Sequence, residues 1–192
     1  DIMAWYGKVI NDADHEMRTR SESLLLGHKE AKTLDLPKPA NNDPRPFEVV
    51  GIPLTPGFHV LEIASPRLGA SLLQDLGTQR TMYVRTSALV TNLGVHFKLG
   101  RENALAWVTT LDKGQPVANA VVRVSSCDGR ELARASTNAQ GLASFKDLSP
   151  EPPRCNNSGL PDAYFVSARN ADDMAFTWSD WQRGIEPWRF NL

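Results

Sequence analysis

The fold is decided by the stretch Ala120-Val-Val-Arg-Val-Ser-Ser-Cys-Asp-Gly-Arg-Glu-Leu-Ala-Arg-Ala-Ser136. Its first part alternates, with Val122 and Val124 on one face, as a half-buried β-strand does. Asp128-Gly129 favours a hairpin turn, because its residues tolerate the positive φ angles that a tight turn requires. A second strand over 131–136 completes the hairpin. The same stretch carries a thiol, acids, bases and hydroxyls that would suit an active site. The rest of the chain has to show whether these residues form such a site or only the turns that connect strands.

The second half of the chain repeats this pattern of short strands and turns. Further strands are predicted over 88–98, 103–111, 142–145, 163–169 and 175–178. Turns rich in glycine, proline and asparagine separate them at a spacing typical of antiparallel sandwiches. The inward-facing residues are expected to include Leu132, Leu142 and Phe145. About seven strands in this half predict one immunoglobulin-like β-sandwich.

The first half is also interpreted as mainly β-structure. Strands are predicted over 5–10, 47–52, 58–64 and 81–85, with at most one or two helical turns within 68–76. The proline-rich segment 34–46 is expected to be an exposed connector. The sequence therefore predicts an all-β protein with two antiparallel β-sandwich domains, over 1–86 and 87–192.

Composition and charge exclude several classes of function. The chain has 192 residues and a formal net charge of −1, with 10 basic against 11 acidic residues in 1–86 and 11 against 11 in 87–192. Nucleic acids and anionic membranes require a basic surface, so neither is expected as a partner. Apolar runs stay well short of the roughly 18 residues of a membrane span, so direct membrane insertion is not expected. With no initiator methionine and no signal peptide, the chain is expected to be a piece of a longer, processed protein.

The two cysteines, Cys127 and Cys155, leave two alternatives open: a disulfide or a pair of buried free thiols. The absence of a Cys-x-x-Cys or a nearby histidine pair makes them poor metal ligands. The sequence favours the disulfide, which implies an oxidising compartment. Closing a loop of this length would stabilise the fold by about 3–4 kcal/mol.

No catalytic, cofactor-binding or metal-binding residue is predicted. The chain lacks Gly-x-Ser-x-Gly, the P-loop and the dinucleotide-binding glycine pattern. Asp172-Asp173 could bind calcium together with Asn170 or Asp180, but an acidic turn between two strands is favoured. The histidines have no spacing typical of metal ligands; they are His15, His28, His59 and His96.

Aromatic residues gather near the end of the chain: Phe176, Trp178, Trp181, Trp188 and Phe190. Such rings can form a platform for sugars or a protein interface. They can equally pack the last strand against another domain, and this interdomain contact is the favoured interpretation.

A family resemblance rests on the run Leu111-Asp-Lys-Gly-Gln-Pro-Val-Ala-Asn-Ala-Val-Val-Arg-Val124, followed by Thr137-Asn138 and Gly141-Leu-Ala-Ser-Phe145. This run resembles the pattern of macroglobulin-type and related sandwich domains. The flanking segments 56–69 and 83–93 are similar to the strands that join such domains in bacterial α2-macroglobulins. The resemblance covers roughly 47–192, and the chain is identified as an N-terminal fragment of the enterobacterial periplasmic type, with macroglobulin- or fibronectin-like sandwiches.

The resemblance implies a scaffold of a broad-spectrum, protease-trapping inhibitor rather than an enzyme. It implies a periplasmic protein, held at the inner membrane by an N-terminal lipid. The implied partners are other domains of the same chain, target proteases and proteins of periplasmic cell-wall synthesis.

This chain departs from the family pattern in three respects that matter for function. Cys127 is followed by Asp-Gly-Arg and not by the Leu-Glu-Gln of a thioester, and neither a bait region nor a lipidation cysteine is identified. The alternative is an extracellular binding module that takes a carbohydrate or protein ligand on its tryptophan cluster.

Overall fold

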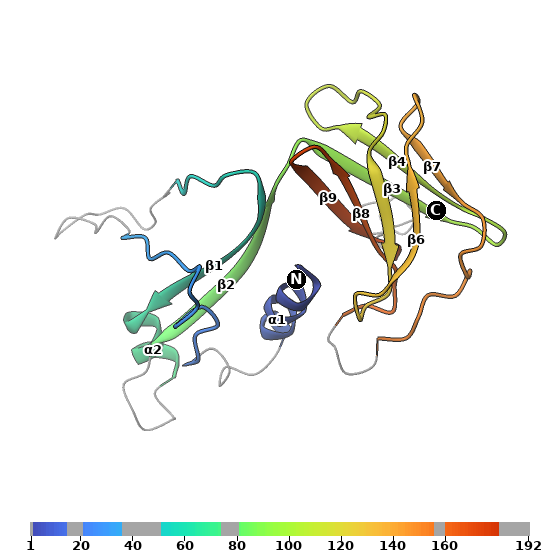
Figure 1. Ribbon diagram of the computed structural model, residues 1–192. Helices are drawn as coiled ribbons and strands as arrows, with labels where there is room; N and C mark the ends of the chain where they lie inside the picture. The colour runs from blue at the N-terminus through green and yellow to red at the C-terminus, as the bar shows by residue number, and fades with distance from the viewer. Residues whose placement is uncertain (1, 15–20, 36–50, 74–80, 156–159, 181–192) are drawn as a thin grey trace, which may run out of the picture.

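The computed structural model describes residues 2–14, 21–35, 51–73, 81–155 and 160–180. Strand pairing is antiparallel in each described sheet. This confirms the predicted all-β class (Figure 1). The elements in chain order are α1 (Ile2–Asp14), β1 (Gly57–Ser65), α2 (Pro66–Leu72), β2 (Met82–Val90), β3 (Leu93–Leu99), β4 (Ala104–Thr110), β5 (Val121–Ser125), β6 (Glu131–Ser136), β7 (Leu142–Phe145), β8 (Phe165–Asn170) and β9 (Asp173–Trp178).

The strands from β3 to β9 form a sandwich of two sheets. One sheet has the order β3-β4-β7 and the other the order β6-β5-β8-β9. Strand β3 lies beside β9, and β6 beside β7, so the sheets meet along both sides. The paired strands β1 and β2 form a separate ribbon that joins the sandwich where β2 leads into β3, and α1 lies between the ribbon and the sandwich (Figure 1).

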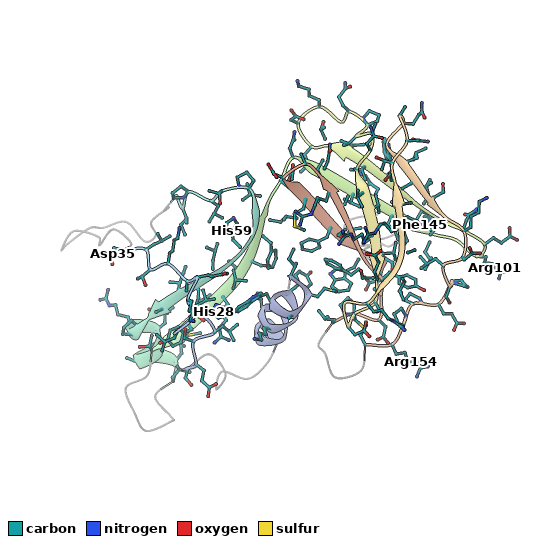
Figure 2. The ribbon with its side chains drawn as sticks, in the orientation of Figure 1. His28, Asp35, His59, Arg101, Phe145 and Arg154 are labelled. Atoms are coloured by element: carbon teal, nitrogen blue, oxygen red, sulfur yellow. A yellow bond between two sulfur atoms is a disulfide. The ribbon has the colours of Figure 1, made fainter. Side chains whose placement is uncertain are left out.

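The core lies between the two sheets and is built by alternation along the strands. Val122 and Val124 of β5 are fully buried, as is Val108 of β4 opposite. Figure 2 shows Phe145 of β7 among the strands of the sandwich, where it packs near Phe97, with ring centroids 6.4 Å apart. Apolar area removed from water at this interface is the main force that holds the sheets together.

Two residues expected to face the core, Leu132 and Leu142, do not face it, each for a different reason. Ser125 pairs with Glu131 but Val124 pairs with Ala133, so Leu132 is the extra residue of a bulge and is 38% exposed. Leu142 and Phe145 are three positions apart and therefore face opposite sides of β7. Ala143 is the residue that joins Phe145 in the core.

The family motif around Thr137 and Gly141 has a structural explanation. The buried hydroxyl of Thr137 donates to the Val117 carbonyl at 2.6 Å and accepts from the Ala120 amide at 2.9 Å. The side-chain oxygen of Asn138 accepts from the amide of Leu142 at 3.0 Å and so shapes the turn. At Gly141, φ is +74° and an added Cβ would lie 2.5 Å from a backbone oxygen, so only glycine fits.

In the first half, the strand predicted over 5–10 is wrong, because these residues lie in helix α1. Met3, Tyr6 and Val9 recur at the helical spacing of three, and Met3 and Val9 are buried. The predicted strand began at Trp5 and therefore left out Met3, the first residue of this stripe. Helix α2 is as short as predicted, and it is capped by the preceding residue, Ser65, whose side chain accepts from the Leu68 amide.

The domain division stays a prediction. The described part of 1–86 contains α1, α2, β1 and most of β2, while 36–50 and 74–80 lie outside the described residues. Most of the strand predicted over 47–52 falls in the first of these gaps. A second sandwich in this half therefore also stays a prediction.

Candidate functional site

The aromatic residues of β9 lie beneath helix α1, on the outer face of the sandwich. Trp178 is 7% exposed, and its ring packs 5.0 Å from Phe165 of β8 and 5.9 Å from Tyr6 of α1. Phe176 contacts Tyr6 and also Phe58 of β1, each with ring centroids 6.0 Å apart. These two rings therefore contact residues of the first half of the chain.

This packing bears on the two interpretations of the tryptophan cluster. A ligand platform needs exposed rings, and Trp178 is covered by α1 in the described part of the chain. Its indole N–H has no hydrogen-bond partner among the described residues, which fits a ring held by packing alone. Trp181, Trp188 and Phe190 lie outside the described residues.

A second group of contacts fixes the junction where β2 leads into β3. One carboxylate oxygen of Asp173 accepts from the Thr91 hydroxyl at 2.6 Å, and the other accepts from the Asn92 amide at 2.9 Å. The side chain of Asn92 bonds Asp112 twice, since its amide group donates to the carboxylate and its oxygen accepts from the backbone. Hydrogen bonds from Thr110 and Asn92 lower the pKa of Asp112.

Asp173 thus has a structural role, as the favoured acidic turn predicted. Both of its carboxylate oxygens already accept hydrogen bonds, so calcium would have to displace partners from the protein. In the described residues, histidine, cysteine, aspartate and glutamate form no group of three or more that could hold a metal ion.

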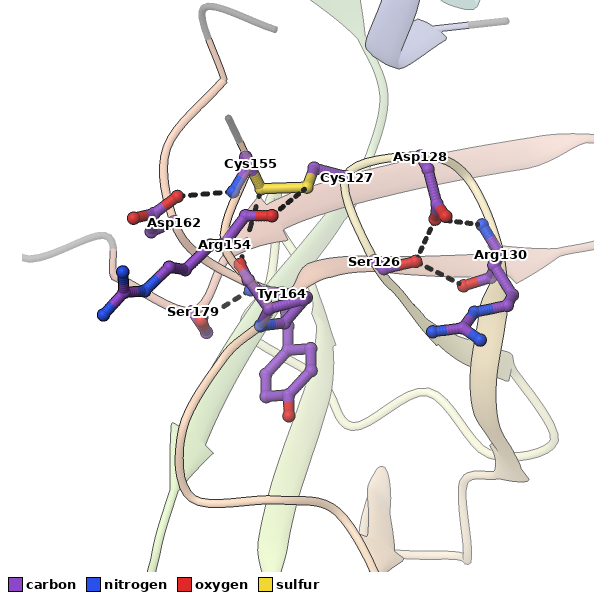
Figure 3. The surroundings of a disulfide bond; sticks show 10 residues. Ser126, Cys127, Asp128, Arg130, Arg154, Cys155, Asp162, Tyr164 and Ser179 are labelled. Atoms are coloured by element: carbon purple, nitrogen blue, oxygen red, sulfur yellow. Dashed lines mark hydrogen bonds between the residues drawn. A yellow bond between two sulfur atoms is a disulfide. The ribbon is translucent and has the colours of Figure 1, made fainter. Parts of the chain in front are cut away.

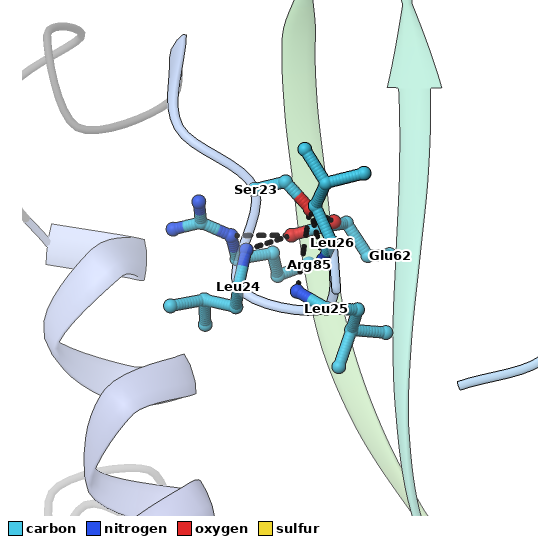
Figure 4. A network of polar contacts seen from close by, with 6 residues as sticks. All are labelled: Ser23, Leu24, Leu25, Leu26, Glu62 and Arg85. Carbon is cyan, nitrogen blue, oxygen red and sulfur yellow. Dashed lines mark hydrogen bonds and ion pairs between the residues drawn. The ribbon is translucent and has the colours of Figure 1, made fainter. Parts of the chain in front are cut away.

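A third group is the nearly buried ion pair of the ribbon (Figure 4). The Arg85 guanidinium donates to Glu62 at 3.0 Å, and both side chains are less than a tenth exposed. The Ser23 hydroxyl and the Leu24 amide also donate to this carboxylate, so the segment at 23–26 is held against β1 and β2. Burial raises the pKa of Glu62, but the hydrogen bonds and Arg85 outweigh it and lower the pKa overall.

The turn that first resembled an active site is stapled by a disulfide (Figure 3). Cys127 and Cys155 are bonded, with their Cα atoms 5.8 Å apart. The Asp128 carboxylate accepts from the Ser126 hydroxyl and the Arg130 amide, and these bonds lower its pKa. The polar groups of the turn therefore hold one another in place.

The histidines lie on different parts of the fold. His28 packs edge-on against Trp5, and His59 bonds the Thr55 carbonyl at 2.7 Å. His96 lies on β3 against Trp107, on the outer face of the β3-β4-β7 sheet. Figure 2 shows His28 and His59 in the first half of the molecule, away from the disulfide near Arg154. His15 lies outside the described residues.

Sequence reasoning missed two long-range contacts: the packing of α1 on β9, and the bond of Asp173 to the junction before β3. The signal for α1 was the apolar spacing of Met3, Tyr6 and Val9, which was available but was interpreted as a strand. The hydrogen bond between Asp173 and Thr91 joins residues 82 positions apart, and no local sequence pattern predicts it. Among the described residues, no helix is long and apolar enough to cross a membrane.

Comparisons with known proteins give a family match and weak structural likeness. The model of the bacterial alpha-2-macroglobulin MG3 domain matches residues 90–192, which is more than half of the chain. No curated protein matches. The match begins at the end of β2 and contains the entire β3–β9 sandwich.

Three solved structures show remote similarity. Native alpha-2-macroglobulin from Escherichia coli spanning domains MG0-NIE-MG1 is 16% identical, with a TM-score of 0.40, over 49% of this chain and 27% of that one. A structure of the same protein spanning NIE-MG1 is 13% identical, with a TM-score of 0.38, over 53% and 41%. Domains d3-d4 of the rat CD45 extracellular region are 13% identical, with a TM-score of 0.27, over 85% of each chain.

The chain spans less than half the length of the two alpha-2-macroglobulin structures that it matches. The family model, by contrast, covers the sandwich whose turns carry the Thr137 and Gly141 motif. The chain belongs to the bacterial alpha-2-macroglobulin family.

Proposed function

We propose that this chain is a non-catalytic scaffold and interaction unit of a bacterial alpha-2-macroglobulin whose full-length protein traps proteases. The observation that carries the proposal is the coincidence of the MG3 family match with the sandwich of β3–β9. Fold alone does not define function, so the proposal for the whole protein also has to be tested on the whole protein.

The chemistry of the described residues supports a scaffold. Catalysis would need a nucleophile, acid or base held next to space for a substrate. Here the polar groups bond to one another instead: Asp173 to the β2–β3 junction, Glu62 to Arg85, and Asp128 within its own turn. The thiol of Cys127 is consumed by the disulfide and is not available as a thioester.

The remaining parts of the proposal concern the full-length protein. It is proposed to be periplasmic, and the disulfide fits an oxidising compartment of this kind. It is further proposed to be anchored to the inner membrane through an N-terminal lipid. Its partners are proposed to be its own domains, target proteases and periplasmic cell-wall synthesis proteins.

A protease assay with two substrates tests this function. The full-length protein and the 192-residue chain are each mixed with an equimolar protease, and cleavage of a large protein and of a short peptide is followed. Trapping should suppress only cleavage of the large protein, because a trapped protease keeps its active site open to peptides. The 192-residue chain should suppress neither reaction.

The possible outcomes separate the two parts of the proposal. Stoichiometric inhibition by the 192-residue chain would show that it is an inhibitor in its own right and overturn the scaffold role. If the full-length protein leaves the cleavage of the large substrate protein unchanged with every protease tested, the trapping role is overturned. Gel analysis of the 192-residue chain is the control for its degradation during the assay.

A further inference from the structure

Three arginines lie together on the outer face of the β6-β5-β8-β9 sheet. Val122 and Val124 of β5 are fully buried, so Arg123 between them faces outward. In register, Arg123 lies directly opposite Arg134 of β6, and Arg169 of β8 is its diagonal neighbour on the other side. All three arginines are exposed. We call these three residues the arginine face.

Among the strand residues described on this side of the sheet, Glu131 is the one carboxylate. Arg134 holds it with two hydrogen bonds, at 2.8 and 2.7 Å, which use both of its oxygens. These bonds hold the pKa of Glu131 below its ordinary value, so it is charged at neutral pH. Arg123 lies 3.6 Å from the same carboxylate, which is too far for a hydrogen bond. Three arginines and one glutamate leave this surface with an excess of positive charge.

The arginine face is unfavourable for the fold by itself. Like charges that lie directly opposite on paired strands destabilise the pair, and Arg123 and Arg134 are placed in this way. In the described part of the chain, the Arg123 guanidinium donates no hydrogen bond, and Arg169 reaches the sulfur of Met174 at 3.9 Å but no carboxylate. Both guanidinium groups therefore have several N–H donors left for an acceptor from outside.

The spacing of Arg123 and Arg169 decides which acceptor fits. Diagonal neighbours on adjacent strands are about 7–8 Å apart. In an extended peptide, side chains two positions apart lie on the same side, about 7 Å from each other. Carboxylates at positions i and i+2 of such a peptide would thus meet the two guanidinium groups, each of which can pair with a carboxylate through two parallel hydrogen bonds.

Other anionic macromolecules fit this surface less well. Nucleic-acid binding commonly involves about 6–10 phosphate contacts. Basic clusters that bind anionic membranes contain about 4–8 lysines or arginines. The arginine face has three arginines, and Arg134 is already paired with Glu131. This number suits a short acidic segment, whose carboxylates pair with guanidinium groups one by one.

We propose that the arginine face binds an extended acidic segment of a partner protein, with carboxylates at positions i and i+2 on Arg123 and Arg169. Glu131 competes with this segment for Arg134 and so limits how tightly it binds. The inference rests on the contacts of β5, β6 and β8 and not on protease trapping, so either proposal can fail alone.

An NMR titration of the 15N-labelled 192-residue chain tests this site at low ionic strength, where charge pairs are least screened. The probe is the peptide Thr-Val-Glu-Thr-Glu-Val-Thr. The control peptide, Thr-Val-Thr-Glu-Glu-Val-Thr, has the same composition and charge, but an extended chain points its two adjacent glutamates to opposite sides. The probe should shift the amide signals of Arg123 and Arg169 at lower concentrations than the control peptide does.

Substitutions separate this site from a general attraction by charge. Arg123→Gln and Arg169→Gln should each weaken binding of the probe roughly three- to fivefold, as expected for the loss of one exposed charge pair. Arg101→Gln is the matched control, because Arg101 is exposed between β3 and β4 of the other sheet and should not affect binding (Figure 2). Glu131→Gln frees the Arg134 guanidinium and should tighten binding.

Three outcomes would overturn the proposal. If the probe fails to shift these amides, or binds no better than the control peptide and weakens equally in R123Q and R101Q, the face has no site for such a segment. If inorganic phosphate displaces the probe at an equal concentration, the site takes a free anion. If the fluorescently labelled probe binds the 192-residue chain but not the full-length protein, as measured by anisotropy, another domain covers the face.

Discussion

At the scale of single residues, polar side chains of this protein connect segments that are far apart in the sequence. Thr137 bonds both Val117 and Ala120, and Asp173 of β9 bonds Thr91. A buried polar group that is paired costs little, whereas an unpaired one costs about 1–3 kcal/mol. Glu62 is the clearest test of this principle, because its carboxylate is nearly buried and has three donors.

Glu62→Gln is expected to lower stability at neutral pH, and the loss should shrink as the pH falls. The pKa of Glu62 is lowered in the folded protein, so its charged form stabilises the fold above its ordinary value of about 4.5. As the pH falls below that value towards the folded pKa, the parent protein loses this contribution and approaches the variant.

The measurement is urea unfolding of parent and variant at several pH values. Glu131→Gln is the control, because Glu131 pairs with Arg134 but is solvent-exposed. An exposed pair of this kind contributes about 0–1 kcal/mol. A difference between parent and E62Q that grows on acidification would contradict the assignment.

At the scale of elements, helix α1 serves as the cover of the outer face of β8 and β9. Its apolar stripe of Met3, Tyr6 and Val9 fits a helix of 13 residues, but isolated helices of this length are marginal in water. Its stability must therefore come from the aromatic rings beneath it. The strand predicted here failed because a short apolar run suits either element, and only the partner surface decides between them.

Tyr6→Asp is expected to detach α1 from the sandwich, because it places a charge between Phe176 and Trp178. Hydrogen–deuterium exchange of the α1 amides should then accelerate strongly, while exchange in β4 and β5 stays slow. Ala4→Asp is the matched control, since Ala4 is exposed on the same helix. If both variants exchange like the parent, α1 is not held by these rings.

At the scale of the whole molecule, the ribbon and the sandwich are connected by the junction at Thr91 and Asn92. Strand β2 leads into β3 there, and the bonds of Asp173 hold this junction against β9. Bonds to a charged carboxylate are roughly twice as strong as those between neutral groups.

Asp173→Asn is expected to loosen this junction without unfolding the sandwich. The Asn92 amide, which donates to Asp173, should lose protection from hydrogen exchange, while the amides of Val122 and Val124 keep theirs. Asp172→Asn removes a charge from the neighbouring, exposed position and should leave Asn92 protected. Equal effects of the two variants would refute the role given to Asp173.

The sequence by itself determined the sandwich, its strand order along the chain and its turns. These follow from local rules: alternation shows which residues face inward, and only glycine adopts the backbone of position 141. The favoured disulfide could be inferred because the chain offers only one pairing. Local rules failed at Leu132, where a bulge in the pairing with β5 shifts the alternation.

Only the tertiary structure decided which faces are covered and which are open. Phe176 and Trp107 both alternate outward on their strands, yet one lies beneath α1 and the other is 42% exposed. Likewise, Glu62, Arg85 and Ser23 become one polar cluster only when the ribbon folds. Burial depends on contacts between segments far apart in the chain, and these depend on how the elements pack and not on any single stretch of sequence.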